Sequence, residues 1–335
     1  MENKIRVVLF GLGPLGAAIA KAMLEKKGMI IVGAVDTARN AAGKDLGEIL
    51  ETDNKLGVTV TDDARSALSK IKANVAIIAT KSSVKGIYPE LTMCIKSGIN
   101  VVSTCEELSY PYYRQPQLSA EIDKLAKKHG VVVLGTGINP GYLMDTLPIA
   151  LTGPCLRVDS IRVTRMMDSS KRRIPFQKKI GTGLTPEQFA KSIRERVITG
   201  HVGLGESIAH IAAALGWTLD SIVEFPPKPV IAEKETTTPY ATVKPGHVAG
   251  LKSLANGIKG GKPVITLEFI ANALVEEEYD AISIEGIPNL NQKIIGGVHG
   301  DVGTVAVVLN MIPKVLNAPP GLAVMKDLPL PSAVG

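Results

Sequence analysis

Residues 5–16 read IRVVLFGLGPLG, an apolar run that enters a Gly-x-Gly-x-x-Gly turn and precedes a helical pattern. In such a turn the first glycine permits a tight bend from strand to helix, and the second lets the backbone approach a pyrophosphate. The third lets the helix lie close to the strand, and the helix N-terminus faces the phosphate charge. We therefore predict that a pyrophosphate lies against Gly11, Leu12, Gly13, Pro14, Leu15 and Gly16.

Three glycines are a weak signal by themselves, but the residues around them have the order that a dinucleotide site requires. Residues 17–27 have apolar side chains at helical spacing, and Gly28 is expected to cap that helix. Residues 29–35, MIIVGAV, have the pattern of a buried strand, and Asp36 follows, 20 residues beyond Gly16. An acidic side chain there can accept hydrogen bonds from the ribose hydroxyls of NAD, so we predict a Rossmann-type dinucleotide site.

The choice between NAD and NADP stays open at this point. Asp36 would repel the 2′-phosphate of NADP, whereas Arg39, three residues further on, could bind it. Thr37 is neutral and favours neither cofactor. All three residues are predicted contacts of the cofactor.

Length and composition describe a globular protein of two domains. The chain has 335 residues, of which 45% are hydrophobic and 21% charged, enough for a large core. The net charge of +6 is spread along the chain and only 4% of residues are aromatic, so nucleic-acid binding is not supported. We expect no membrane contact, because no apolar run approaches the roughly 20 residues of a membrane span.

The cysteines and the first residues bear on location. Cys94, Cys105 and Cys155 lack metal-ligand spacing, so we expect reduced thiols and no metal site. The first residues lack the regions of a signal peptide. Together these features predict a cytoplasmic protein.

The first half of the chain alternates strand and helix patterns, as in a doubly wound parallel sheet. In the second half strand patterns follow one another closely, with Gly260 and Gly261 as a predicted hairpin turn, which favours an α+β domain with a mixed or antiparallel sheet. We expect residues 1–145 to bind the dinucleotide and residues 146–297 to bind substrate and form a dimer. The helical C-terminal segment, residues 298–335, should pack back on the first domain.

Ligands of an open parallel sheet bind outside the carboxyl ends of its strands, so each strand end is a candidate contact. The strand at residues 74–79 is followed by hydroxyl and ammonium groups that can reach the nicotinamide-side ribose. A polar surface loop is the alternative interpretation. We predict cofactor contacts here and after the next strand, at Ala79, Thr80, Lys81, Ser82, Thr104 and Cys105.

Two carboxylates, Glu106 and Glu107, follow the strand at residues 100–103, beside the expected nicotinamide. A carboxylate can bind an ammonium or iminium group and can act as a general base, so this pair suits an amine substrate. Alternatively, both side chains are solvated or cap the next segment, because glutamate is usually exposed. We predict that one of the two is catalytic.

The next predicted strand is followed by GTGINPGYLMD at residues 135–145. Gly135 and Gly137 would let the backbone approach the nicotinamide ring closely. Asn139 is expected to cap a helix with Pro140 at its first position, and both are predicted cofactor contacts.

One charge cluster, at residues 168–173 and 178–179, is either a solvated face or a site for a substrate carboxylate or the cofactor phosphates. The five histidines have no metal-ligand spacing. His210 lies on an apolar helical face, whereas His201 and His299 lie next to glycines and could border a cleft. No Gly-x-Ser-x-Gly elbow is present, so a Ser-His-Asp hydrolase is not indicated.

Several motifs carry a family resemblance: NVVSTCEELSYP at residues 100–111, LGTGINPG at 134–141, GDVGT at 300–304, NMIP at 310–313, PGL at 320–322 and DLP at 327–329. Over nearly the whole chain they resemble the 2,4-diaminopentanoate dehydrogenases and the related native amine dehydrogenases. The resemblance implies a dihydrodipicolinate-reductase-like architecture, a homodimer, and interconversion of amines with carbonyl compounds and ammonia by use of NAD or NADP. It also implies a glutamate that holds the amine.

That glutamate maps to Glu106 or Glu107. We choose Glu106, because residues 101–106 are similar in length to the segment of homoserine dehydrogenases that ends in their catalytic lysine. Residues 166–177, MMDSSKRRIPFQ, resemble the amine dehydrogenase branch, which takes simpler carbonyl compounds. Core packing is the alternative role for Tyr142 and Met144. We place the substrate pocket at Tyr142, Leu143, Met144, Met167, Phe176 and Gln177.

These observations predict an NAD(P)-dependent amine dehydrogenase that reductively aminates a ketone or aldehyde. The alternatives are a 2,4-diaminopentanoate dehydrogenase acting on an amino-acid substrate, a dihydrodipicolinate reductase-like oxidoreductase, and a binding protein that senses the cofactor. The second of these needs a basic, histidine-rich anion site, which the acidic loop at Glu106 contradicts.

Overall fold

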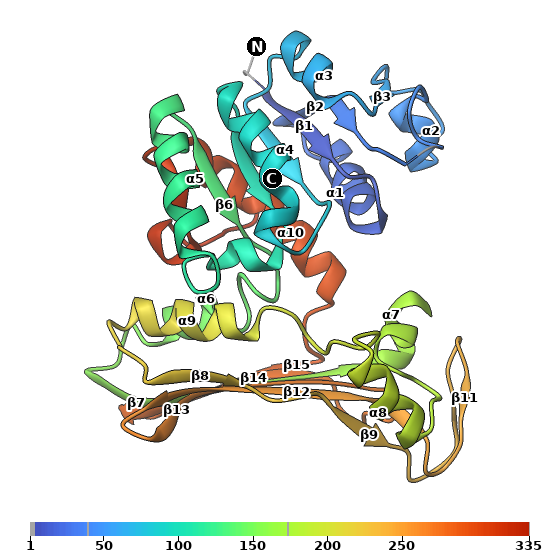
Figure 1. Cartoon of the computed structure of the whole chain (residues 1–335), viewed down its shortest axis with the longest axis vertical. Helices are drawn as coiled ribbons and strands as arrows, with labels where there is room; N and C mark the ends of the chain where they lie inside the picture. Colours follow the sequence, from blue (N-terminus) through green and yellow to red (C-terminus); the bar gives the residue numbers. More distant parts are fainter. Residues whose placement is uncertain (1–3, 39, 173, 335) are drawn as a thin grey trace. The chain divides into compact units, whose positions relative to one another are not determined.

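The computed structural model describes residues 4–38, 40–172 and 174–334 (Figure 1). The chain divides into two compact units: Met1–Tyr142 with Gly300–Gly335 form unit 1, and Leu143–His299 form unit 2. Arg39, one of the predicted cofactor contacts, lies outside the described residues. No helix within the described ranges is both long and apolar enough to cross a membrane.

Unit 1 contains a seven-stranded sheet made of β1 (Ile5–Phe10), β2 (Met29–Val35), β3 (Val60–Thr61), β4 (Val75–Ile78), β5 (Asn100–Ser103), β6 (Val132–Gly135) and β16 (Gly321–Ala323). Its strands are all parallel and lie in the order β16-β6-β5-β4-β1-β2-β3. The strand order reverses between β1 and β4, which confirms the predicted doubly wound sheet. Ligands of such sheets bind at the carboxyl ends of the strands beside this switch point.

Helices cover both faces of this sheet: α1 (Pro14–Leu24), α2 (Leu46–Leu50), α3 (Ala64–Lys70), α4 (Val84–Lys96), η1 (Glu106–Ser109), α5 (Pro116–His129), α10 (Gly300–Leu316) and η3 (Met325–Asp327). Helices α1 and α10 pack together on one face, and α3, α4 and α5 pack side by side on the other (Figure 1). The main core of this unit lies between the strands and α4 and α5. It includes Phe10, Ile87, Leu91, Ile122 and Val133.

Unit 2 is built on a mixed sheet made of β7 (Arg157–Asp168), β8 (Ser221–Glu224), β9 (Lys228–Ile231), β12 (Val248–Lys259), β13 (Lys262–Asn272), β14 (Tyr279–Ile287) and β15 (Leu290–Ile295). The order is β15-β14-β7-β13-β12-β8, and β9 also pairs with β12. Strands β7 and β13 are parallel and the other pairs antiparallel, which confirms the predicted mixed sheet. Gly260 and Gly261, both at positive φ, form the predicted hairpin turn.

The remaining elements of unit 2 are α6 (Thr146–Leu151), η2 (Ser169–Lys171), α7 (Ile174–Lys179), α8 (Pro186–Arg194), α9 (Leu204–Ala214), and the short pair β10 (Thr236–Thr237) and β11 (Thr242–Val243). Helix α9 packs on β8, β12 and β13 (Figure 1). On β7 the side chains alternate between two faces of the sheet. The buried face carries Ile161, Val163, Arg165 and Met167.

Two predicted helix caps are wrong. Helix α1 ends at Leu24 with Glu25 as its C-cap, and Gly28 lies in the turn before β2, where its carbonyl accepts a hydrogen bond from the Ile5 N–H at 2.9 Å. Asn139 and Pro140 open no helix, because the residues from Asn139 to Asp145 form turns. The carboxylate of Asp145 caps α6 instead, by accepting from the Thr146 N–H at 2.6 Å.

Candidate active site

The glycine-rich turn between β1 and α1 is held by close backbone contacts at two of its three glycines. A Cβ on Gly16 would lie 1.9 Å from the carbonyl oxygen of Gly11, and a Cβ on Gly11 would lie 2.7 Å from that of Ala79. Gly11 also has a φ of +88°, which favours glycine. By contrast, a Cβ on Gly13 would meet no atom within 4 Å. The turn is therefore packed against protein on one side and open at Gly13.

That open side can take an anion. Helix α1 begins at Pro14, and no side chain caps its first turn. The positive end of the helix and its first N–H groups are thus available to a phosphate. Leu15 is half-buried in the same turn. These features fit the pyrophosphate of a dinucleotide.

Asp36 joins the end of β2 to this turn. Its Oδ2 accepts a hydrogen bond from the Leu12 N–H at 2.6 Å, and its Oδ1 accepts from the Ala38 N–H at 2.7 Å. The acidic side chain thus lies beside the glycine-rich turn, where the ribose of a bound dinucleotide would follow the pyrophosphate. Thr37 is exposed next to it.

The residues after β4 lie at the same end of the sheet, and their polar side chains bond to α4. The Thr80 hydroxyl donates to the Glu90 carboxylate at 2.7 Å, and the Lys81 ammonium donates to a carbonyl of α4 at 3.2 Å. The Ser82 carbonyl accepts a hydrogen bond from η1 at 3.2 Å. This segment is therefore tied to α4 on one side and to η1 on the other.

After β5 the chain passes through Thr104 and Cys105 into η1. The Thr104 N–H donates to the Ile78 carbonyl at 3.0 Å, which keeps the loop beside the end of β4. The Cys105 side chain is 1% exposed and packs in the core of unit 1. Burial raises the pKa of its thiol to about 12, so it stays neutral. Only the backbone of Cys105 can therefore contact a ligand.

The two neighbouring carboxylates in η1 have different surroundings. Glu107 Oε2 accepts a hydrogen bond from the Val84 N–H at 2.9 Å, at the first residue of α4. The half-buried side chain of Glu106 has no hydrogen-bond or ion-pair partner among the described residues. Its backbone carbonyl accepts from the Ser109 hydroxyl at 2.7 Å. Glu107 is thus engaged by the protein, whereas the Glu106 carboxylate is available.

Gly135, the last residue of β6, and Gly137, two residues later, leave room for protein backbone. A Cβ on Gly135 would lie 2.3 Å from the carbonyl carbon of Leu108 in η1. A Cβ on Gly137 would lie 3.3 Å from the carbonyl oxygen of Pro140. Asn139 is half-buried in the turn between them and α6.

Most predicted substrate-pocket residues belong to unit 2. Tyr142 is half-buried at the end of the first segment of unit 1, and Leu143 and Met144, 2% and 1% exposed, begin unit 2. Met167 and Phe176 lie in one apolar cluster with residues of α8, β12 and β13. The buried Gln177 amide donates to the Arg172 carbonyl at 2.8 Å and supports the preceding turn.

A polar cavity of unit 2 is lined by part of the predicted charge cluster and by a buried ion pair that sequence reasoning missed. It has a volume of about 150 Å³ and carries charges of both signs. Arg165 and Asp280, 2% and 4% exposed, lie opposite each other on β7 and β14, with 3.3 Å between Nη1 and Oδ1. Burial lowers the pKa of Arg165 and raises that of Asp280. The available signal was Arg165 itself, a charge at an inward position of a strand. Further polar lining residues are Asp168, Lys171, Arg172, Glu278 and His299.

His201 lies in the same unit and is held neutral. Its ring stacks on Phe269 with 4.3 Å between ring centroids, and its backbone N–H donates to the Ser253 hydroxyl at 3.1 Å. Burial, with further contributions from Arg165 and Lys179, lowers the pKa of His201 to about 3. Within the described ranges, no group of three or more His, Cys, Asp or Glu is placed to hold a metal ion.

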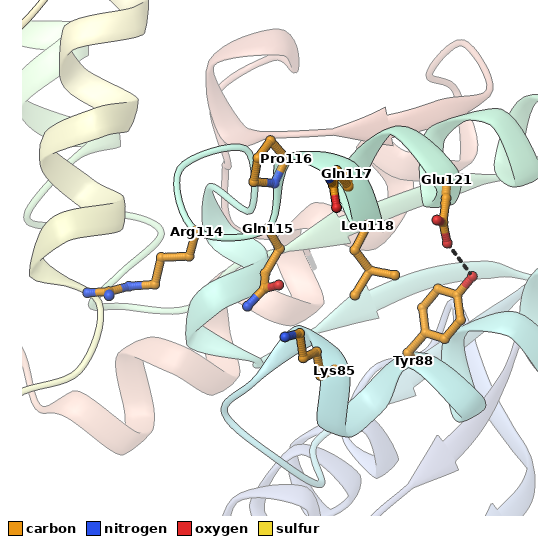
Figure 2. A pocket seen from close by; sticks show the side chains of 8 residues that line it. All are labelled: Lys85, Tyr88, Arg114, Gln115, Pro116, Gln117, Leu118 and Glu121. Atoms are coloured by element: carbon orange, nitrogen blue, oxygen red, sulfur yellow. Dashed lines mark hydrogen bonds between the residues drawn. The ribbon is translucent and has the colours of Figure 1, made fainter.

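A second cavity, of about 550 Å³, lies in unit 1 between the first turns of α4 and α5 (Figure 2). The side chains of Lys85 and Gln115 point toward each other, and the Tyr88 hydroxyl lies 3.2 Å from the Glu121 carboxylate. None of its lining residues is a predicted site residue. No residue of the glycine-rich turn or of η1 lines this cavity.

Comparisons with known proteins agree with these features. The model for the 2,4-diaminopentanoate dehydrogenase C-terminal domain matches residues 142–335, and that for the dihydrodipicolinate reductase N-terminus matches residues 5–136. The 2,4-diaminopentanoate dehydrogenase of Acetoanaerobium sticklandii is 35% identical over 99% of this chain and 95% of its own length.

Two amine dehydrogenases are also similar over the whole chain. That of Streptomyces virginiae is 24% identical over 99% of this chain and 98% of its own length. The solved structure of the amine dehydrogenase from Mycobacterium smegmatis has 28% identity and a TM-score of 0.84, covering 100% of this chain and 99% of that one. As its motifs predicted, the chain belongs to the 2,4-diaminopentanoate dehydrogenase family.

Proposed function

We propose that this protein is an NAD(P)-dependent amine dehydrogenase, which interconverts a primary amine with a ketone or aldehyde and ammonia. Family membership supports the reaction class, since relatives carry the names 2,4-diaminopentanoate dehydrogenase and amine dehydrogenase. The observation that carries the proposal is the Glu106 carboxylate, half-buried at the carboxyl end of β5 and without a partner among the described residues.

The cofactor in this proposal is NAD or NADP, and no metal is required. The turn at Gly11, Gly13 and Gly16 would hold the pyrophosphate, and Asp36 the adenosine ribose. The bound nicotinamide would supply the hydride acceptor or donor. Asp36 carries a negative charge beside the ribose, so NAD should bind more tightly than NADP.

Glu106 would act on the substrate nitrogen. A carboxylate forms a charge-assisted hydrogen bond with an ammonium or iminium N–H, which is about twice as strong as a neutral one. It would thereby hold the nitrogen in place, and it could accept or return the proton that amine and imine exchange. Holding the reacting groups together also removes much of the entropic cost of the reaction.

A second candidate is a dehydrogenase whose substrate carries an amino-acid group, as in the 35% identical relative. The observation that favours it is a set of cationic side chains near one another in unit 2: the field of Arg165 and Lys179 acts on His201, and Arg172 lines the same cavity as Arg165. Such groups suit a carboxylate. Dihydrodipicolinate reductase-like chemistry is disfavoured by the acidic Glu106.

We place a homodimer interface on the open face of the unit 2 sheet. Gly257 faces α9, since its Cβ would lie 2.8 Å from Ile208 Cγ2. The side chains that alternate with this covered face, including Arg162 and Thr164 on β7, point to the opposite side. We expect light scattering to give twice the chain mass, and Thr164→Arg to give the mass of one chain. A single-chain mass for the wild type would contradict this interface.

The compartment in this proposal is the cytoplasm. All three cysteines are free thiols, as expected in a reducing compartment.

The test is consumption of NADH and NADPH at high ammonia with a panel of ketones and aldehydes. The panel includes 2-amino-4-oxopentanoate and its matched control pentan-2-one, which has the same carbon chain without the amino-acid group. Preference for pentan-2-one supports a simple amine dehydrogenase, and preference for the amino acid supports the second candidate. Cofactor binding without ammonia-dependent turnover of any member would contradict both and favour a cofactor-sensing protein.

A further inference from the structure

We infer that Glu107 is a positioning residue, which fixes the turn that carries Glu106 against the segment between β4 and α4. The inference rests on the proposed function, in which Glu106 is the catalytic carboxylate. It gives the second glutamate of the pair a role that does not involve touching the substrate.

Glu107 makes two hydrogen bonds to one short segment of chain. Its side-chain Oε2 accepts from the Val84 N–H at 2.9 Å, and its backbone N–H donates to the Ser82 carbonyl at 3.2 Å. The two bonds start from different atoms of the same residue, so together they restrict both the position and the rotation of η1. Both bonds reach the segment after β4, whose residues 79–82 are predicted to contact the cofactor.

The side-chain bond also completes the N-terminus of α4. The Ser83 hydroxyl accepts from the Gly86 N–H at 3.2 Å, which leaves the N–H of the fully buried Val84 to Glu107. A negative charge at a helix N-terminus is favourable, because the helix dipole is positive there. The Glu107 carboxylate is therefore held in place, whereas that of Glu106 is not.

The other side of η1 rests on β6. Leu108 is fully buried, and its backbone fills the space where Gly135 lacks a side chain. Without the Glu107 bond, η1 would keep this contact and lose its side-chain link to α4. The distance from the Glu106 carboxylate to the segment at Ser82 would then vary, while the core beneath stays packed.

The test compares Glu107→Ala with Glu107→Gln, since the glutamine carbonyl can still accept from the Val84 N–H. We expect kcat to fall about 10- to 100-fold in Glu107→Ala, with little change in the Kd of NADH, because small misplacements of reacting groups cost about this much. Glu107→Gln should recover kcat to within about threefold and keep the wild-type pH profile.

Hydrogen exchange gives a readout that does not depend on turnover. The Val84 amide should exchange faster in Glu107→Ala than in the wild type, and Glu107→Gln should keep it protected. Equal loss of kcat in both variants would show that the charge of Glu107 itself is needed and would overturn the inference, as would wild-type kcat in Glu107→Ala. If Glu107→Ala does not fold, loss of kcat in Glu107→Gln with the Val84 amide still protected would overturn the inference. A wrong assignment of Glu106 as the catalytic carboxylate gives a different result, because Glu106→Gln would then stay active.

Discussion

The carboxylate of Asp36 accepts a hydrogen bond from the backbone N–H of Leu12 at 2.6 Å. The end of β2 is thereby joined to the glycine-rich turn after β1, two segments that must act together to hold a dinucleotide. A second bond, from the Ala38 N–H at 2.7 Å, fixes the other oxygen. The acidic group is thus oriented by the protein before a ribose arrives, which reduces the ordering that cofactor binding requires.

Replacing Asp36 with alanine should therefore weaken NADH binding and reduce the preference for NADH over NADPH. We expect the Kd of NADH to rise about 10-fold or more, which corresponds to about 1.4 kcal/mol. The Kd of NADPH should change less, because loss of the negative charge removes repulsion of the 2′-phosphate. Fluorescence titration of wild type and Asp36→Ala with each cofactor measures both Kd values. Equal weakening of both would contradict a specificity role for Asp36.

Two glycines of the turn should respond differently to alanine. Gly16→Ala places a Cβ 1.9 Å from the Gly11 carbonyl oxygen, so we expect a lower melting temperature and loss of cofactor binding. The Cβ added in Gly13→Ala meets no atom within 4 Å, so the melting temperature of this variant should match that of the wild type. The same Cβ would occupy the open side of the turn, so NADH should bind more weakly. Unchanged NADH binding in a stable Gly13→Ala would contradict the pyrophosphate site.

The sequence predicts the two sheets and the turn at Gly11 because glycine spacing and runs of apolar residues are local signals. Only the family resemblance favours Glu106 over Glu107, because the partner of Glu107 is Val84, on another helix. The sequence also predicts Gly28 as the cap of α1, but the helix ends earlier and Gly28 instead bonds to the start of β1.

The sequence also does not predict the buried ion pair of unit 2. Arg165 and Asp280 are far apart in the chain and become neighbours only through the register of β7 and β14. The close approach of the Leu108 backbone to Gly135 is likewise a contact between segments that are distant in sequence. Local patterns thus predict elements, whereas partners that are distant in sequence require the fold.

Stability should fall at acidic pH because of His201. Its folded pKa, lowered to about 3, lies below the ordinary value of 6.5, so the unfolded chain binds the proton more readily. The stabilising contribution is present above pH 6.5 and is lost as pH falls towards the folded pKa. Between pH 8 and pH 5 it should fall by about 2 kcal/mol. Urea unfolding of wild type and His201→Phe measures this, and an identical pH dependence of the two would contradict it.

The buried pair of Arg165 and Asp280 should show a large cost for single replacements and a small one for the double replacement. Burial dominates the pKa of both groups, so their attraction does not fully offset the loss of hydration. Arg165→Met leaves the Asp280 carboxylate without its ion-pair partner and should cost about 3–5 kcal/mol. Adding Asp280→Leu should recover most of that. Additive losses in denaturant unfolding would contradict this account.

The most direct test of the account is ammonia-dependent oxidation of NADH by Glu106→Gln, with Glu107→Gln as its matched control. We predict that Glu106→Gln lowers kcat about 100-fold or more, as loss of a general acid–base group does, and leaves the Kd of NADH unchanged. Glu107→Gln should stay within about threefold of the wild type, because its carbonyl still accepts from the Val84 N–H. Near-normal kcat in Glu106→Gln with an inactive Glu107→Gln would contradict the assignment of the catalytic carboxylate.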